Sequence, residues 1–309
     1  MKFFKLKFNL VQIAISGVLF LASFILVPNF ALAATTFLTA DFESVAVGDT
    51  AIINVRMDTD GKNPNVVEGN ISIKAGADKI KITDLSVAGS ALTFWPQYPS
   101  LGPNSTIYFT GGTPGGFKQK SGLLLKIIFV AEKEGEVIFE PNNIKAYNND
   151  GKATPIEVFN NPLTIGIVSV KDSLPKNQWE EIISQDKEPP QDLAATFGRD
   201  DSIFDGKKFI TISASDSQSG IDYYEVIEGN NPAVRSGETY VLLDQSEASI
   251  IIVAVYDKAG NQSKISLAPG SQPKINYARL IIVFIVLLAL VYGLFKIMEL
   301  FKRKNVWHK

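Results

Sequence analysis

The sequence predicts an all-β protein in which two β-sandwich domains are followed by one C-terminal transmembrane helix. Three observations predict this fold class. Short runs of alternating apolar and polar residues are separated by Gly, Asn and Pro, the pattern lapses in the middle of the chain, and an apolar run stands near each end. The lapse at residues 166–191 is expected to be a linker between a first sandwich at 34–165 and a second at 192–268.

The first apolar run, from Phe8 to Val27, follows three lysines and leads to Ala31-Leu32-Ala33. A basic start, an apolar stretch and a small-x-small end are typical of a secretory signal peptide. We therefore expect residues 1–33 to be removed by cleavage before Ala34. Because the run exceeds the usual length of about 15 residues, an uncleaved N-terminal anchor is the alternative.

Strands account for most of the first domain. Ile53, Val55 and Met57 alternate with polar neighbours, which is the period of a half-buried strand. Further strands are predicted at 71–73, 80–82, 107–110, 123–131 and 137–139, and no segment with helical period interrupts them. Many short strands with turn residues between them indicate a β-sandwich.

Several turn segments follow one another in a familiar order. They are Val47-Gly48-Asp49-Thr50, Asn65-Val66-Val67-Glu68-Gly69, Gly122 and Asn149-Asp150-Gly151, with the segments 92–96 and 108–117 between them. This order resembles the cohesin domain, in a membrane-anchored bacterial form. The resemblance implies a jelly-roll sandwich related to carbohydrate-binding modules, which in the best-known members binds dockerin, a calcium-binding helical protein. The chain holds no dockerin, catalytic module or cohesin array, so no family contact residue is carried over.

Aromatic residues gather between residues 94 and 117, where the chain holds Phe94, Trp95, Tyr98, Tyr108, Phe109 and Phe117. Exposed rings stack on the apolar faces of sugars, whereas large aromatics are more often buried, so core roles are favoured for most of the six. Tyr108 and Phe109 are neighbours on a strand and should face opposite sides. Trp95 and Tyr98 flank Pro96 in an expected loop and are the better ligand-binding candidates, followed by Phe94 and Phe117.

Asp58-Thr59-Asp60-Gly61 places oxygen ligands on alternate residues, as a calcium loop does. The spacing of the EF-hand loop fails, because Lys62 occupies its fifth position and Asn63 stands where its glycine belongs. The segment is therefore predicted to be a polar turn. No metal site and no cofactor is predicted, and calcium is unsupported by the spacing.

The linker at 166–191 is predicted to be an exposed connection that is stiffened near its end by Pro189-Pro190. One helical turn is expected within it, at 179–183. Strands return at 209–214, 223–227, 240–243, 249–256 and 264–267, enough for a small immunoglobulin-like sandwich. Within it, Asp216–Ile221 and Asp257–Asn261 resemble segments of bacterial Ig-like surface repeats. Asp and Asn bond to backbone in tight turns, so a structural role is favoured over ligand binding for both segments. The expected role of this domain is a stalk.

The second apolar run, Leu280 to Phe295, holds 16 residues without a charge, and its flanks extend the predicted span to 277–298. As a helix the run reaches roughly 24 Å against a hydrocarbon core of about 30 Å, a shortfall that flanking residues can cover. Residues 299–309 are rich in Lys and Arg, which indicates a cytoplasmic tail and an extracellular position for the domains before it. A buried core helix is the alternative.

Composition excludes several kinds of chemistry. The chain has no Cys, and its only His is His308 in the predicted tail, so no Ser/His/Asp triad, Cys/His pair or His-ligated metal can form outside the membrane. Residues 34–278 carry 21 Lys and Arg against 31 Asp and Glu, which argues against a nucleic-acid partner.

The function expected is therefore a non-catalytic, membrane-anchored cell-surface protein that binds a polysaccharide or a protein. A structural component of the cell envelope is the first alternative. A glycosidase that works with carboxylates alone is a less favoured one. Exposure of both Trp95 and Tyr98 on one flat face would favour ligand binding, and burial of both would favour the structural role.

Overall fold

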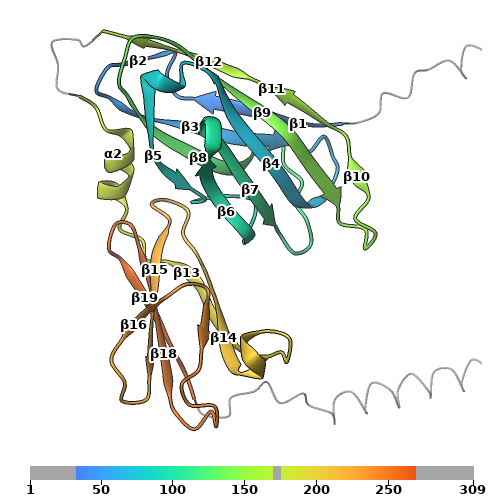
Figure 1. The fold of residues 1–309 in the computed structure, drawn as a ribbon, viewed down its shortest axis with the longest axis vertical. Helices are drawn as coiled ribbons and strands as arrows, with labels where there is room; N and C mark the ends of the chain where they lie inside the picture. Colours follow the sequence, from blue (N-terminus) through green and yellow to red (C-terminus); the bar gives the residue numbers. More distant parts are fainter. Residues whose placement is uncertain (1–32, 170–174, 269–309) are drawn as a thin grey trace, which may run out of the picture. The chain divides into compact units, whose positions relative to one another are not determined.

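The computed structural model describes residues 33–169 and 175–268, which are almost entirely β-structure and divide into two compact units (Figure 1). Unit 1 holds the described residues up to Gln191 together with Ser215–Asp222 and Asp257–Asn261. Unit 2 holds Asp192–Ala214, Tyr223–Tyr256 and the described residues from Gln262 on. The predicted signal peptide, apart from its last residue, and the predicted span lie outside the described residues. Within residues 33–169 and 175–268, no helix has the length and apolar character needed to cross a membrane.

Unit 1 consists of two sheets packed face to face (Figure 1). One has five strands in the order β11-β1-β3-β8-β5, and the other runs β2-β12-β9-β4-β7-β6 with β10 paired to β9. The strands are β1 (Ala34–Ala40), β2 (Ser44–Ala46), β3 (Thr50–Asp58), β4 (Pro64–Ala75), β5 (Ile80–Ser86), β6 (Phe94–Gly102), β7 (Thr106–Gly112), β8 (Gly122–Ala131), β9 (Gly135–Asn148), β10 (Pro155–Ile156), β11 (Val158–Asn161) and β12 (Leu163–Val168). Two 3-10 turns, η1 (Ala77–Lys79) and η2 (Pro103–Ser105), precede β5 and β7.

The core lies between these sheets and follows the predicted alternation. Ile53, Val55 and Met57 on β3 are fully buried, as their period predicts. From the opposite sheet Phe139 on β9 meets Phe129 on β8, with ring centroids 6.0 Å apart. Burial of such rings and branched side chains supplies most of the free energy that holds two sheets together.

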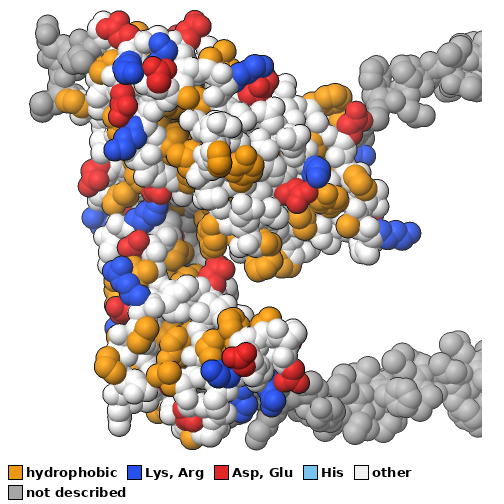
Figure 2. All heavy atoms as spheres, in the orientation of Figure 1, with side chains coloured by type: hydrophobic (Ala, Val, Ile, Leu, Met, Phe, Trp, Pro, Cys, Tyr) orange, Lys and Arg blue, Asp and Glu red, His pale blue; other side chains and the backbone are white. Residues whose placement is uncertain are grey.

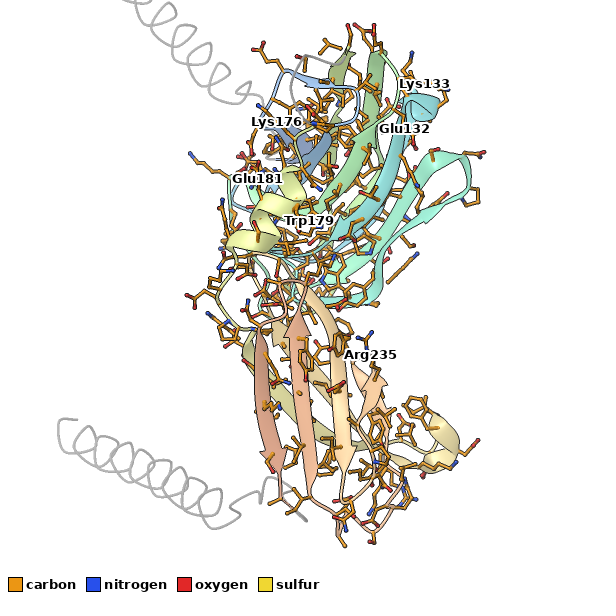
Figure 3. All side chains as sticks on the ribbon, turned by 90° about the vertical axis from the view of Figure 1, so that its left-hand side faces the viewer. Glu132, Lys133, Lys176, Trp179, Glu181 and Arg235 are labelled. Atoms are coloured by element: carbon orange, nitrogen blue, oxygen red, sulfur yellow. The ribbon has the colours of Figure 1, made fainter. Side chains whose placement is uncertain are left out.

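Helix α2 (Gln178–Gln185) corrects the expectation of an exposed linker. The side chain of Asn177 caps its first turn by accepting a hydrogen bond from the Glu180 amide at 3.0 Å. Trp179 is buried against Ile52 of β3 and Ile128 of β8, on the outer face of the five-stranded sheet (Figure 3). Residues 179, 182 and 183 form one apolar stripe at helical spacing, so this part of the linker packs instead of standing in solvent. It has eight residues, about two turns, where one turn was expected.

Unit 2 consists of two small sheets, β13-β14-β17 and β16-β15-β18-β19 (Figure 1). All five strands expected from the sequence are present, and two more were missed, at 191–199 and 234–236. Its elements are β13 (Gln191–Arg199), the 3-10 turn η3 (Phe204–Gly206), β14 (Lys208–Ser215), β15 (Ile221–Glu228), β16 (Val234–Ser236), β17 (Thr239–Val241), β18 (Ile251–Asp257) and β19 (Gln262–Leu267). Ile210, Val226 and Val253 are fully buried, one from each of three strands, so the unit has its own apolar core.

Candidate binding surface

The two outer faces of unit 1 differ, because α2 covers part of the five-stranded sheet whereas β9, β4, β7 and β6 present side chains to solvent. On β4 and β9 these side chains are polar and paired. Lys145 Nζ lies 3.5 Å from Glu68 Oε1, which also accepts a hydrogen bond from the Tyr147 hydroxyl at 3.3 Å. Lys74 and Glu140 form a second ion pair at 3.2 Å. Such exposed pairs add little stability, but they give this face a charged and hydrated area.

Large apolar side chains are exposed along β6 and its neighbour β7, at the edge of the same sheet. Phe94, Tyr98 and Leu101 on β6 are 58%, 47% and 50% exposed, and Tyr108 on β7 is 39% exposed. We call these four residues the β6–β7 patch. Figure 2 shows apolar side chains at the surface of this part of unit 1. Several large exposed apolar side chains on adjacent strands mark a surface that can bind a partner.

Trp95 does not lie in a loop, as expected, but on β6, where it is 6% exposed. Its neighbour across the sheet explains the burial. A Cβ atom at Gly111 of β7 would lie 2.9 Å from the Trp95 ring and 2.8 Å from Leu92, so only glycine leaves room for the indole. Phe117 is 7% exposed and also belongs to the core. Neither ring can offer its face to a ligand at the surface.

Trp95 instead supports a ring that is exposed. The rings of Trp95 and Tyr98 are stacked, with centroids 6.0 Å apart and planes 27° apart. The buried indole therefore limits the positions open to the Tyr98 ring. One of the two rings is buried and the other is exposed. The criterion set above needed both rings exposed or both buried, so it does not decide between ligand binding and a structural role.

The burial of the six aromatic rings agrees only in part with the prediction. Tyr108 points outward and Phe109 is buried, as the strand period predicted. Three of the six rings are therefore core residues and three are exposed, where core roles had been favoured for most. The missed signal was Gly111, which leaves space for the Trp95 ring on the neighbouring strand.

Strand β6 is the last strand of its sheet, and its sequence opposes further pairing. Pro96 and Pro99 have no amide hydrogen to donate, and the register with β7 shifts on either side of Gln97. Edge strands built in this way resist addition of another strand. The patch therefore offers side chains, and not a backbone ladder, to a partner.

The aspartate-rich segments are turns, as predicted. Asp58 Oδ1 accepts a hydrogen bond from the Asp60 amide at 2.8 Å, which closes the 58–61 turn. Asp216 Oδ1 accepts from the amides of Gln218 and Gly220, and Asp257 Oδ1 accepts from Asn261. These bonds agree with the structural role favoured for both segments.

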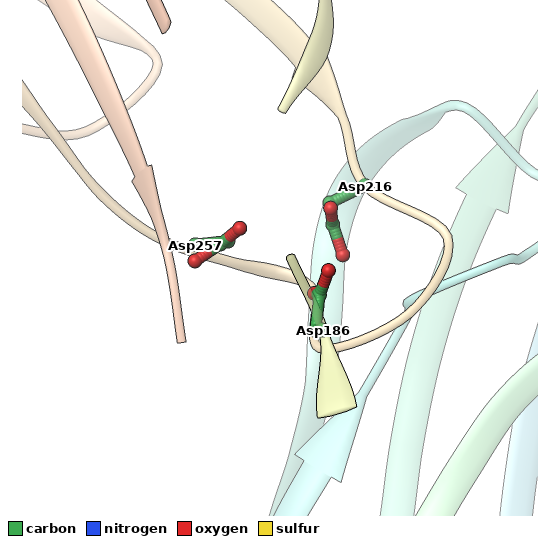
Figure 4. A group of neighbouring side chains, drawn as sticks. All are labelled: Asp186, Asp216 and Asp257. Carbon is green, nitrogen blue, oxygen red and sulfur yellow. The ribbon is translucent and has the colours of Figure 1, made fainter. Parts of the chain in front are cut away.

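A feature missed in the sequence is that three of these side chains meet. One carboxylate oxygen each of Asp186, Asp216 and Asp257 lies within 4.8 Å of the other two (Figure 4). Asp186 and Asp257 are buried, so this group is not an open pair of acids between which a sugar could enter. Oxygen ligands of this kind can hold a hard metal ion.

Sequence comparison finds no matching family model and no curated relative. Structure comparison finds similar folds among cohesins. A cohesin module of the family 33 glycoside hydrolase from Clostridium perfringens is 8% identical with a TM-score of 0.38, covering 45% of this chain and 99% of that one. A type I cohesin from a cohesin–dockerin complex of Clostridium thermocellum is 13% identical with a TM-score of 0.35, covering 44% and 95%.

A non-cellulosomal cohesin from the archaeon Archaeoglobus fulgidus is 15% identical with a TM-score of 0.33, covering 44% of this chain and 92% of that one. The similarity to each of these structures extends over less than half of this chain and nearly the whole of the other. In fold, the first part of this chain is a β-sandwich of two sheets that enclose one apolar core.

Proposed function

We propose that this protein is a non-catalytic, membrane-anchored cell-surface protein that binds another protein through the β6–β7 patch of its first sandwich. The observation that carries the proposal is the contrast in unit 1 between a sheet covered by α2 and a sheet edge on which four large apolar side chains are exposed. Exposing such residues costs free energy in an isolated domain, which a partner recovers by covering them.

The composition of the surface favours a protein over a polysaccharide. Tyr108 of the patch lies on β7, the strand beside β4, and β4 carries Glu68, which is ion-paired with Lys145 of β9. An apolar centre with a charged border is typical of protein–protein interfaces. Sugar sites need rings beside unpaired hydrogen-bonding groups, and here the indole best suited to stacking is buried. The Clostridium thermocellum cohesin described above is bound to a dockerin. The proposal for this chain rests on its own surface.

Anchoring and absence of catalysis complete the proposal. The apolar run at 280–295 with its basic flank supports a single span with the domains outside the cell, and unit 2 then serves as a spacer. Without Cys, and with His308 as the only histidine, the exported part has no nucleophile–base pair of the usual kinds. Carbonate extraction tests the span, since the full chain should stay with membranes and a chain that ends at residue 276 should not.

Affinity capture with the patch altered tests the binding function. Full-length protein carrying both Phe94→Ala and Tyr98→Ala should capture its partner from a cell-envelope extract at least about tenfold less well than the unaltered protein. Phe159 on β11 is equally exposed, at 57%, but lies in the other sheet. Phe159→Ala therefore serves as the matched control and should leave capture unchanged.

Two outcomes would count against the proposal. Capture that survives the double substitution would place the binding surface elsewhere. A glycan array that detects a polysaccharide, with binding lost in the same double variant, would keep the patch but replace the protein partner by a sugar.

A further inference from the structure

Three segments that are distant in sequence bring carboxylates together in unit 1. Asp186 follows the last turn of α2, Asp216 lies in the 216–220 loop, and Asp257 ends β18 (Figure 4). Their nearest oxygens are mutually within 4.8 Å. Calcium–oxygen distances are about 2.3 to 2.6 Å, so two ligands on opposite sides of one ion are about 4.6 to 5.2 Å apart. The spacing of these oxygens fits a shared calcium ion.

The hydrogen bonds to these carboxylates come from uncharged groups. Asp186 accepts from the amides of Glu188 at 3.0 Å and Ser219 at 3.1 Å. Both bonds to Asp216 go to its Oδ1, at 3.0 and 2.6 Å, and Asp257 accepts from the amide and the side-chain nitrogen of Asn261. Amides orient carboxylates without neutralising them.

No ion pair neutralises the group within the described parts of the chain. The ammonium group of Lys258 is paired with Asp84 and lies 5.3 Å from the ring centroid of Trp179. Lys126 Nζ lies 5.8 Å from the same centroid, and its charge and that of Asp216 attract each other without forming an ion pair. One such lysine does not balance the charges of three carboxylates. Three adjacent acids, two of them buried, therefore repel one another unless a cation joins them.

Ser219 provides a second observation that points to a ligand. The residue has no exposed surface, and its amide donates to Asp186, so its side chain begins beside the carboxylates. Its hydroxyl is buried and has no hydrogen-bond partner. Buried hydroxyls are nearly always satisfied, and one that is not indicates a missing partner such as an ion or its water.

We propose that Asp186, Asp216 and Asp257 bind a calcium ion, with the Ser219 hydroxyl bound to the ion or to one of its waters. The ligands are all oxygens, which excludes the soft metals that prefer sulfur and imidazole. They come from three loops with unequal burial, and calcium accepts such irregular sets of six to eight oxygens more readily than magnesium, which demands a near-octahedral shell. The ion joins the end of α2 to the 216–220 loop and to the end of β18.

Calorimetric titration of the full chain with calcium chloride tests this assignment. The protein is purified in detergent, stripped with a chelator and titrated, and one ion should bind per chain. Calcium should also raise the melting temperature by several degrees, since it binds only the folded state. Magnesium should give a weaker response.

Asp216→Asn separates metal binding from a purely structural role. Asparagine keeps the oxygen that accepts from Gln218 and Gly220 but loses the charge. We expect calcium affinity to fall at least about tenfold and the melting temperature without calcium to stay equal or rise, because one repelling charge is gone. Asp60→Asn, in the exposed 58–61 turn, is the matched control and should behave as the unaltered protein.

Ser219→Ala should likewise weaken calcium binding without lowering the melting temperature of the metal-free protein, since it removes an unsatisfied hydroxyl. The proposal is overturned if calcium produces no heat at millimolar concentration, or if Asp216→Asn leaves the calcium response intact. It is also overturned if Asp216→Asn lowers the metal-free melting temperature while calcium has no effect, since the carboxylates then serve only as turn acceptors. Equal binding of magnesium and calcium would overturn the choice of calcium.

Discussion

In unit 1, the outer face of the five-stranded sheet is partly covered by α2, whereas the outer face of the other sheet is exposed to solvent. The sequences of their strands differ accordingly. On the five-stranded sheet, β8 runs through Leu123, Leu124, Leu125, Ile127, Ile128 and Phe129, all of them buried. On the other sheet, β7 alternates between exposed Tyr108 and its buried neighbours Ile107 and Phe109. A strand covered on both sides can be apolar throughout, whereas a strand with one open side must alternate. Lys126 is the one polar residue in this stretch of β8, and α2 covers Ile128 on the outer face of the strand.

Removing the cover should have the largest effect on stability. Trp179→Ala deletes the buried ring that rests on Ile52 and Ile128, and we expect the free energy of unfolding to fall by about 3 kcal/mol. Urea denaturation of the full chain measures it. Leu243→Ala removes a side chain that is 66% exposed and should change stability by no more than about 0.5 kcal/mol. Loss of partner capture in folded Trp179→Ala protein would contradict the division between a covered and a binding face.

The next prediction concerns a substitution that adds a methyl group beside the exposed edge strand β6. Gly111→Ala places a methyl group against Trp95 and Leu92, and overpacking of this kind should cost about 1 to 3 kcal/mol. Because Tyr98 stacks on Trp95, partner capture should fall as well. A methyl group added at Gly237 would meet no atom within 4 Å, so Gly237→Ala is the control. Unchanged near-ultraviolet circular dichroism together with unchanged capture would show that Trp95 does not hold Tyr98 in place.

The smallest expected effect on stability comes from the ion pair beside helix α2. Lys258 pairs with Asp84 and lies over the Trp179 ring, and both members of the pair are less than one-third exposed. Lys258→Met should cost about 0.5 to 1 kcal/mol, measured by urea denaturation, since it removes the pair and the contact with the ring. The exposed pair of Lys133 with Asp78 provides the comparison, and Lys133→Met should change stability by less. Equal losses in both variants would show that burial near α2 does not strengthen the pair.

Much of the fold could be predicted from local pattern. Each alternating or apolar run expected to be a strand is one. The orientation of Tyr108 against Phe109 followed from the strand period. These features are encoded over a few consecutive residues, because side chains of a strand alternate whatever lies across the sheet.

The candidate site was less accessible to such reasoning. Trp95 and Phe94 are adjacent and both aromatic, yet one is buried and the other exposed. They face opposite sides of β6, and Gly111 on the next strand leaves the room that the buried indole needs. Proline residues at 96 and 99 suggested a loop, whereas the edge of a sheet tolerates them within a strand.

Local pattern was enough to predict that the chain is built mainly of β-strands, and composition was enough to show that it has no Cys and no His before His308. Three features became visible only in the folded chain. The first is the choice of aromatic rings that reach the surface, and the second is the covering of part of the five-stranded sheet by α2. The third is the meeting of Asp186, Asp216 and Asp257, which are 30 and 41 residues apart in sequence. The reason is physical. Alternation is set by the backbone of one strand, whereas burial at an edge and the meeting of charges depend on segments that only folding brings together.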